Sequence, residues 1–278
     1  MNIRAAAVRI WDGLWYLFYV SLRVLLRLLM GKRRRNWVLS LLGLHFSRAH
    51  SVKFGSLLHH YESAVFRVVR NVLSDKHSRT FIDLGACVGY YTLYAYRFLR
   101  KKGVFTIVAV EPFPNNYRIL EQWLHGGNIY LVKKAVWLRD GEEVEFDVPD
   151  IQSNNDVTSM GGRITLTKRH LMDGKRGGKT LRVGTVRLDT LIKMFELEKV
   201  DLVKMDIEGA EYPVLTDPSL DLSKVENMIV EVHYRYGSRE DREIMAALAR
   251  QGFKLAPLYP ESHSDFYHLL AYRGEMPW

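Results

Sequence analysis

Cysteine is almost absent from this chain of 278 residues. The one cysteine, Cys87, cannot form a disulfide within the chain, so a secreted, disulfide-stapled fold is excluded. The sequence also lacks internal repeats and the compositions typical of collagen or coiled coils. Aromatic residues, in contrast, make up 12% of the chain, which excludes disorder over most of its length. Length and composition together predict one or two globular domains.

Acidic residues are nearly missing from the first fifty positions. Residues 1–50 hold nine Lys or Arg and one acid, Asp12, although the whole chain carries a net charge of only +9. Residues 51–278 are therefore close to neutral. A nucleic-acid-binding protein needs a basic surface on its folded body, so we expect no nucleic-acid partner. A basic N-terminal segment is typical of contact with an anionic membrane surface.

A long charge-free apolar run is missing too. The longest such stretch at the N-terminus, 13–22, has ten residues, whereas a membrane span needs roughly 20. Residues 5–30 nevertheless predict a helix with one narrow polar stripe, followed by four cations at 32–35. This helix could cap the domain, lie in a membrane interface or form a tilted span. We expect residues 5–35 to meet an anionic membrane, with the protein in the cytoplasm and peripheral on the inner membrane face.

Helix-like and strand-like stretches alternate in the rest of the chain. We therefore expect an N-terminal helical segment, 1–50, and one catalytic domain, 51–278. Short, continuously apolar strands indicate an open, mostly parallel α/β sheet, and two closing strands of hairpin type indicate an antiparallel edge. The expected helices are 57–73, 90–102, 115–124, 189–197 and 238–252, and the expected strands are 80–85, 104–112, 129–137, 199–207, 227–234, 253–259 and 266–273.

Local signals add detail to this pattern. Asp189 and Ser238 are predicted to be helix N-caps, because each precedes an amphipathic stretch. Residues 142–188 contain short alternating pieces that indicate hairpins.

Polar and glycine residues gather where the expected strands end. A glycine loop, 83–89, follows the first strand, Glu111 ends the second, and the run 206–211 follows a later one. Glu231 and His233 are two residues apart on one strand and so share a face. Ligands in open parallel sheets bind at these carboxyl ends, so we expect one crevice there.

The glycine loop has the spacing G-x-x-x-G. Small residues let the backbone approach a ligand at a helix N-terminus, and an acid at position 111 can accept both ribose hydroxyls of an adenosine ligand. A dinucleotide fingerprint would need glycine where Cys87 stands, and no Walker lysine follows. Two alternatives stay open: an NAD-type Rossmann oxidoreductase, and a non-catalytic, membrane-associated module of the same fold.

Five blocks of sequence resemble the FkbM family of S-adenosylmethionine-dependent methyltransferases. They are FIDLGACVGYYTL (81–93), VAVEPFPNNYRIL (108–120), KKAVW (133–137), VRLDTLI (186–192) and DLVKMDIEGAEYPVL (201–215). The run D-I-E-G-A-E is the most specific of them, and the resemblance covers residues 57–275. Cys87 departs from the asparagine common in the family, and Met205 is a conservative apolar change.

The resemblance implies a class I methyltransferase fold, which is Rossmann-like and has a mostly parallel seven-stranded sheet with an antiparallel edge. Here the N-terminal helices would be added to it. It also implies S-adenosyl-L-methionine as cofactor and O-methylation of a hydroxyl on a glycan, glycolipid or similar alcohol. The residues that it assigns to the cofactor are Tyr61, Glu62, Asp83, Gly85, Ala86, Gly89, Glu111, Pro112, Phe113, Ala135 and Asp206.

An alcohol becomes a good nucleophile only when its proton is removed. His233 is the first candidate base, because the unperturbed pKa of histidine lies near neutrality. Asp206 and Glu208 are the next candidates. We expect no metal, although Asp206, Glu208, Glu231 and His233 could instead hold Mg²⁺ through waters.

Overall fold

The computed structural model describes residues 60–124, 126–148, 163–165, 179–258 and 266–277. Its contacts divide the chain into two units, Met1–Ser63 and Ala64–Trp278, and the second carries the site. The expected N-terminal segment, 1–50, lies outside the described residues, and so do the predicted boundary at residue 50 and the membrane contact. Among the residues described, no helix combines the length and apolar character that crossing a membrane requires.

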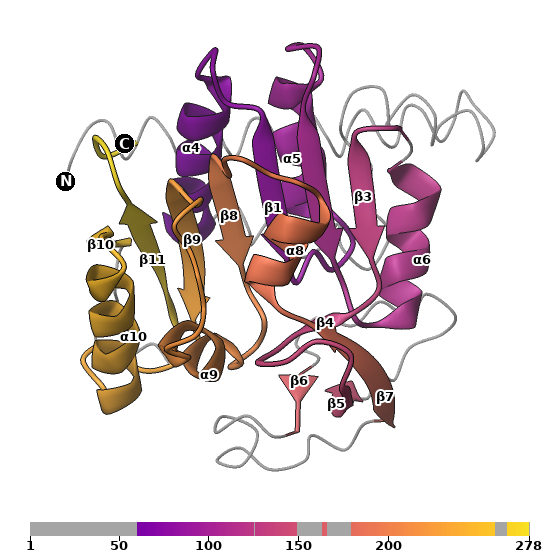
Figure 1. The fold of residues 1–278 in the computed structure, drawn as a ribbon, viewed down its shortest axis with the longest axis vertical. Coiled ribbons are helices and arrows are strands. Elements are labelled where there is room, and N and C mark those ends of the chain that lie inside the picture. The colour runs from indigo at the N-terminus through magenta and orange to yellow at the C-terminus, as the bar shows by residue number, and fades with distance from the viewer. Residues whose placement is uncertain (1–59, 125, 149–162, 166–178, 259–265, 278) are drawn as a thin grey trace. The chain divides into compact units, whose positions relative to one another are not determined.

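A seven-stranded sheet forms the centre of the second unit, in the order β10-β11-β9-β8-β1-β2-β3 (Figure 1). Five consecutive strands, β9, β8, β1, β2 and β3, run parallel to one another. Strand β11 is antiparallel to both of its neighbours, β9 and β10. This confirms the class I methyltransferase architecture, antiparallel edge included. The strands are β1 (Thr80–Leu84), β2 (Thr106–Val110), β3 (Ile129–Val132), β8 (Leu202–Met205), β9 (Asn227–Val232), β10 (Lys254–Leu258) and β11 (Tyr267–Tyr272).

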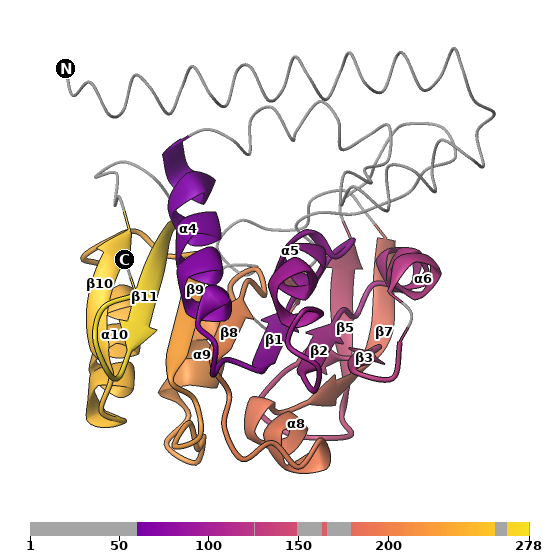
Figure 2. The ribbon, with the colours of Figure 1, turned by 90° about the horizontal axis from the view of Figure 1, so that it is seen from above.

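Helices cover the sheet because its central strands are apolar on both faces. All five residues of β1 and all four of β8 are buried. From Ala64 on, α4 (His60–Ser74) packs with α5 (Tyr90–Leu99) on one face, where Val68, Leu73 and Leu99 join Phe81 in the core. Figure 2 shows these two helices on one side of the sheet and α8 on the other.

Two of the remaining four helices test the predicted caps. They are α6 (Pro114–Trp123), α8 (Leu188–Met194), α9 (Glu211–Thr216) and α10 (Arg239–Arg250). Ser238 caps α10 as predicted, since its hydroxyl accepts from the Asp241 amide at 3.2 Å. The prediction for Asp189 was wrong: Arg187 is the N-cap of α8, and Asp189 lies in its first turn. Asp189 instead binds the partly buried Arg187 guanidinium at 2.9 Å, which needs an ionic partner there.

A smaller four-stranded sheet, in the order β4-β7-β5-β6, lies at the carboxyl ends of the parallel strands (Figure 1). It contains the predicted hairpins, and its strands are β4 (Ala135–Val136), β5 (Glu143–Val148), β6 (Arg163–Ile164) and β7 (Lys179–Val186). The prediction of a single strand over 129–137 was wrong. It divides at Lys133 and Lys134 into β3, which stays in the large sheet, and β4, which pairs with β7. The chain thereby crosses from one sheet to the other beside the site.

Candidate active site

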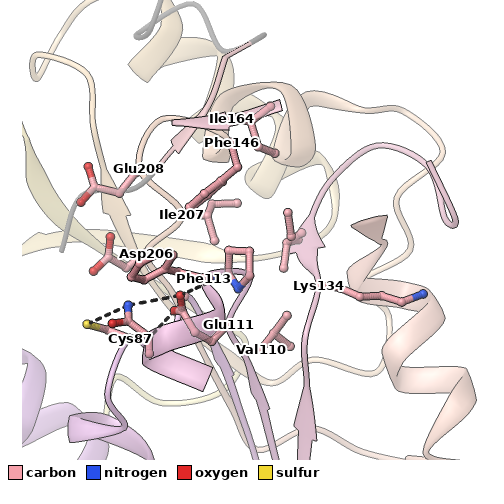
Figure 3. A pocket seen from close by; sticks show the side chains of 15 residues that line it. Cys87, Val110, Glu111, Phe113, Lys134, Phe146, Ile164, Asp206, Ile207 and Glu208 are labelled. Carbon is pink, nitrogen blue, oxygen red and sulfur yellow. Dashed lines mark hydrogen bonds between the residues drawn. The ribbon is translucent and has the colours of Figure 1, made fainter. Parts of the chain in front are cut away.

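A pocket lies where the large and small sheets meet (Figure 3). Glu111 and Cys87 lie at one end of it, and Phe146 and Ile164 of the small sheet lie at the other. The pocket is at the carboxyl ends of the parallel strands, as the fold predicts. The pocket wall includes Gly85, Cys87, Glu111, Pro112, Phe113, Asn116, Lys134, Ala135, Phe146, Ile164, Asp206, Ile207 and Glu208.

The first position of the glycine loop must be glycine because it lies against the end of a neighbouring strand. Gly85 has φ +78°, and a Cβ there would lie 1.7 Å from the Asp206 carbonyl oxygen. The Gly85 and Ala86 amides both donate to the Val110 carbonyl oxygen, at 3.0 and 2.9 Å. The loop therefore ties together the ends of β1, β2 and β8, and any side chain at residue 85 would separate them.

Glu111 is buried at the end of β2 and organises the floor of the pocket. Its carboxylate accepts from the Cys87 amide at 2.8 Å, the Phe113 amide at 2.9 Å and the Asn116 side-chain amide at 3.3 Å. Burial raises the pKa of Glu111 to about 8, although these three hydrogen bonds oppose the rise. A carboxylate has about four acceptor positions, so roughly one stays available to a ligand hydroxyl.

Two further carboxylates share one buried lysine. Lys204 Nζ lies 2.8 Å from Asp206 Oδ2 and 4.8 Å from the centre of the Tyr91 ring. Asp83 neighbours Lys204 across the sheet, and its Oδ2 accepts from the Thr92 hydroxyl at 2.5 Å. Within the described part of the chain, Asp83 Oδ1 is buried and has no hydrogen-bond partner. The site thus holds an acceptor that a cationic or N–H group could satisfy.

His233 lies among four carboxylates at the ends of β8 and β9. Its Nδ1 lies 3.0 Å from Glu211 Oε1, and its Nε2 lies 3.6 Å from Glu208, 3.7 Å from Glu231 and 3.9 Å from Asp206. His233 is buried and does not contribute to the pocket wall as the described residues form it, whereas Asp206 and Glu208 do. A group that enters the pocket therefore meets the carboxylates before the imidazole.

This arrangement sets the charge of each group. Burial lowers the pKa of His233, but the carboxylates of Glu211, Glu208 and Glu231 outweigh it and raise that pKa to about 10. Burial raises the pKa of Glu208 to about 7; the negative charges of Asp206 and Glu231 add to the rise, and His233 opposes it. At neutral pH His233 is therefore protonated, while Glu208 titrates.

The same donors could hold a divalent cation. Asp206, Glu211 and His233 each offer one ligand atom, and these atoms lie within 4.8 Å of one another. Oxygen and imidazole ligands suit Mg²⁺ or Mn²⁺. Lys204, 2.8 Å from Asp206, would however compete with a metal ion for that carboxylate.

The family of the chain follows from comparison with known proteins. The model of the methyltransferase FkbM domain matches residues 83–255, which is more than half of the chain. The chain belongs to the FkbM methyltransferase family. This confirms the resemblance seen in the sequence, and with the strand order it makes the chain an S-adenosylmethionine-dependent methyltransferase by family and fold.

Individual relatives of this FkbM chain are distant. AMB antimetabolite synthetase AmbE of Pseudomonas aeruginosa is 28% identical over an alignment of 206 residues, with 63% of this chain covered; the chain spans only 9% of that protein. The FkbM methyltransferase structure from Methylobacillus flagellatus is 13% identical, with 86% of this chain and 59% of that chain covered and a TM-score of 0.40. Aeropyrum pernix fibrillarin with bound S-adenosyl-L-methionine is 13% identical, with 74% and 76% covered and a TM-score of 0.41.

The residues present fit S-adenosylmethionine. The Gly85 turn keeps the loop free of side chains beside the pocket, Glu111 retains acceptor capacity, and Pro112 and Phe113 offer apolar surface to a purine ring. The FkbM site therefore has an acceptor and an apolar wall that suit the cofactor.

The structure brings together most of the predicted cofactor residues. Those in the pocket wall are Gly85, Glu111, Pro112, Phe113, Ala135 and Asp206. Asp83, Ala86 and Gly89 belong to the same strand end and loop but lie behind that wall; Gly89, with φ +89°, begins α5. Tyr61 and Glu62 fall in α4, but their side chains are outside the described part of the structure, so their role stays a prediction.

Sequence reasoning missed several residues of the site. Phe146 and Ile164 reach the pocket from the small sheet, and Asn116 binds Glu111 from α6. No motif marks Phe146 and Ile164, because only the tertiary fold brings them there, whereas Asn116 lies inside the quoted block 108–120. Lys204 and Glu211 lie inside the block 201–215, but the sequence assigned them no role. Their burial in the structure indicates that they have one. A charged residue in an otherwise apolar strand, such as Lys204, was the available signal.

Proposed function

We propose that this methyltransferase transfers a methyl group to a hydroxyl of a glycan, glycolipid or similar alcohol. The observation that carries the proposal is the pair of carboxylates, Asp206 and Glu208, in the pocket wall, backed by His233. A neutral hydroxyl needs a proton acceptor at the reacting centre, whereas many stronger nucleophiles do not. Carboxylates also accept hydrogen bonds from sugar hydroxyls.

S-adenosylmethionine supplies an electrophilic methyl group on a sulfonium sulfur. In the proposal, Glu208 takes the proton from the acceptor hydroxyl, because its pKa of about 7 leaves it partly ionised at neutral pH. The protonated His233, 3.6 Å from Glu208, stabilises that ionised form. This reassigns the base from His233, whose pKa is too high for it to be neutral near pH 7. Asp206 stays paired with Lys204.

The N-terminal segment supports a membrane-associated acceptor. Residues 1–50 carry nine basic residues and one acid, which favours an anionic membrane surface and hence lipid-linked glycans as substrates. We propose a peripheral location on the inner membrane face on this basis.

An acceptor screen tests the proposed function. The full chain is incubated with methyl-labelled S-adenosylmethionine and panels of free sugars, glycolipids, amines and short-chain alcohols. We expect label only on compounds that carry a free hydroxyl, in an alkali-stable ether linkage. Label on amines alone would contradict O-methylation, and no label on any acceptor by a chain that binds the cofactor would favour the non-catalytic alternative.

A further inference from the structure

Glu211, the first residue of α9, is a fully buried acid, and the proposed reaction gives it no role. Both oxygens of its carboxylate have partners. Oε1 accepts from the Ile207 amide at 2.9 Å and lies 3.0 Å from His233 Nδ1, and Oε2 accepts from the Gly209 amide at 2.8 Å. One side chain thus joins the end of β8 to the end of β9.

The two amides that Glu211 holds flank Glu208. Glu208 itself has φ +54°, a left-handed conformation that is strained for a residue with a side chain. A turn of this kind persists only when its surroundings hold it, and the Glu211 bonds lie on both sides of the strained residue. The hydroxyl of Tyr234, two residues beyond the end of β9, donates to the Gly209 carbonyl oxygen at 3.0 Å and so also holds the turn.

We propose that Glu211 is the positioning residue of the reaction: it fixes the turn that presents Glu208 to the pocket and orients the His233 ring behind it. The inference rests on the proposed function, because it assigns Glu208 as the proton acceptor. Glu211 does not reach the pocket wall in the described structure, so it acts through these two residues alone.

A glutamate is required here by geometry. In Glu211→Gln, one carboxylate oxygen becomes an NH₂ group. If that group replaces Oε2, it faces the Gly209 N–H; if it replaces Oε1, it faces the Ile207 N–H. Either way, two donors oppose each other and one amide loses its acceptor. Glu211→Asp keeps the charge, but its shorter side chain cannot reach both amides and His233.

A purely structural role is the competing explanation, and the chain offers a matched control. Asp241 is also a buried acid at the start of a helix; it accepts from the Gly237 amide at 2.7 Å and binds the Tyr267 hydroxyl. It does not belong to the pocket wall. Asp241→Asn should therefore lower stability without a specific effect on turnover.

The experiment compares the full-length parent with Glu211→Gln, Glu211→Asp and Asp241→Asn. Three quantities are measured for each: turnover at saturating donor and acceptor, the Kd of S-adenosylhomocysteine, and hydrogen exchange of the Ile207 and Gly209 amides. For both Glu211 variants we expect turnover to fall roughly 10- to 100-fold, the Kd to stay within about threefold and the two amides to exchange faster. Asp241→Asn should keep turnover within about twofold and leave those amides protected.

Each outcome decides the inference. Parental turnover in Glu211→Gln, unchanged amide exchange, or a joint loss of turnover and cofactor binding that matches the loss of folded protein would overturn it. A parent that binds S-adenosylhomocysteine but methylates no hydroxyl compound contradicts the proposed function instead, and the inference falls with it. The two failures are therefore distinguishable.

Discussion

The charge of each titratable side chain in this site is set by its neighbours. His233 contacts four carboxylates, so the pKa that sequence alone assigns to it, near neutrality, does not hold. The pKa of Glu208 is raised to about 7, well above that of an ordinary carboxyl group, so Glu208 titrates near neutral pH. The sequence identified both residues as candidates, but only their burial and spacing separate the proposed proton acceptor, Glu208, from the cation behind it, His233.

The pH dependence of turnover follows from Glu208. Its carboxylate accepts a proton only when ionised, so turnover should rise with pH through about 7 and then level off. The groups that face Glu208 and set this value are Asp206, Glu211, Glu231 and His233. Initial rates at saturating substrates between pH 5 and 9 provide the measurement. A rate that falls as pH rises from 6 to 8 would contradict the assignment.

Replacement of the proton acceptor tests the same residue directly. In Glu208→Gln, the amide cannot take a proton, so kcat should fall by about 10²- to 10⁴-fold. The Kd of S-adenosylhomocysteine should change little, because Glu111 and the glycine loop are untouched. Glu198→Gln, at a highly exposed carboxylate, is the control and should keep the parental kcat. A Glu208→Gln enzyme with parental kcat would return His233 or Asp206 to consideration.

At the scale of elements, the alternation of apolar strands with amphipathic helices was sufficient to predict the large sheet. Its strands are buried on both faces, and burial on both faces leaves a continuous apolar run in the sequence. The small sheet was predicted only as hairpins, because β5 is solvated on one face and β4 and β6 have only two residues each. Helix α9 was missed: six residues are too few to show a helical period.

The close approach of β1 and β8 gives a stability prediction. Gly85→Ala places a Cβ against the Asp206 carbonyl oxygen and also requires an alanine at φ +78°, so the free energy of unfolding should fall by at least about 3 kcal/mol. Gly103→Ala is the matched control, since its φ is +76° but no atom lies within 4 Å of the added Cβ. It should cost only about 1–2 kcal/mol. Urea denaturation of both variants measures the difference, and equal losses would show that the contact does not matter.

For the whole molecule, the N-terminal segment predicts association with membranes. The full chain should sediment with vesicles that contain anionic lipid and should not sediment with neutral vesicles, because four consecutive cations occupy residues 32–35. Replacement of all four with glutamine should abolish the difference, and so should about 0.5 M salt. Equal binding to both vesicle types would contradict an electrostatic contact.

Removal of metal ions should leave turnover unchanged. Lys204 and the protonated His233 already balance part of the negative charge at the strand ends, so the reaction that we propose needs no further cation. Turnover after dialysis against a chelator should stay within about twofold of the untreated enzyme. Loss of turnover that added Mg²⁺ or Mn²⁺ restores would instead assign Asp206, Glu211 and His233 as metal ligands.

Most of the cofactor side of the site could be predicted, whereas the acceptor side could not. Gly85, Glu111 and Asp206 follow strands, and strand ends of a parallel sheet meet at one edge, so their meeting is a consequence of topology. Phe146 and Ile164 enter from a second sheet whose placement no local pattern encodes. The identity of the acceptor therefore stays a proposal.

Calorimetric titration of the full chain with S-adenosylhomocysteine and, separately, with NAD tests the central claim most directly: that the ends of β1, β2 and β8 form one site for a sulfonium nucleoside. We predict binding of S-adenosylhomocysteine, no binding of NAD, and affinity at least about tenfold weaker in Glu111→Gln but unchanged in Glu121→Gln, an exposed acid on α6. Binding of NAD alone, or parental affinity for S-adenosylhomocysteine in Glu111→Gln, would contradict it.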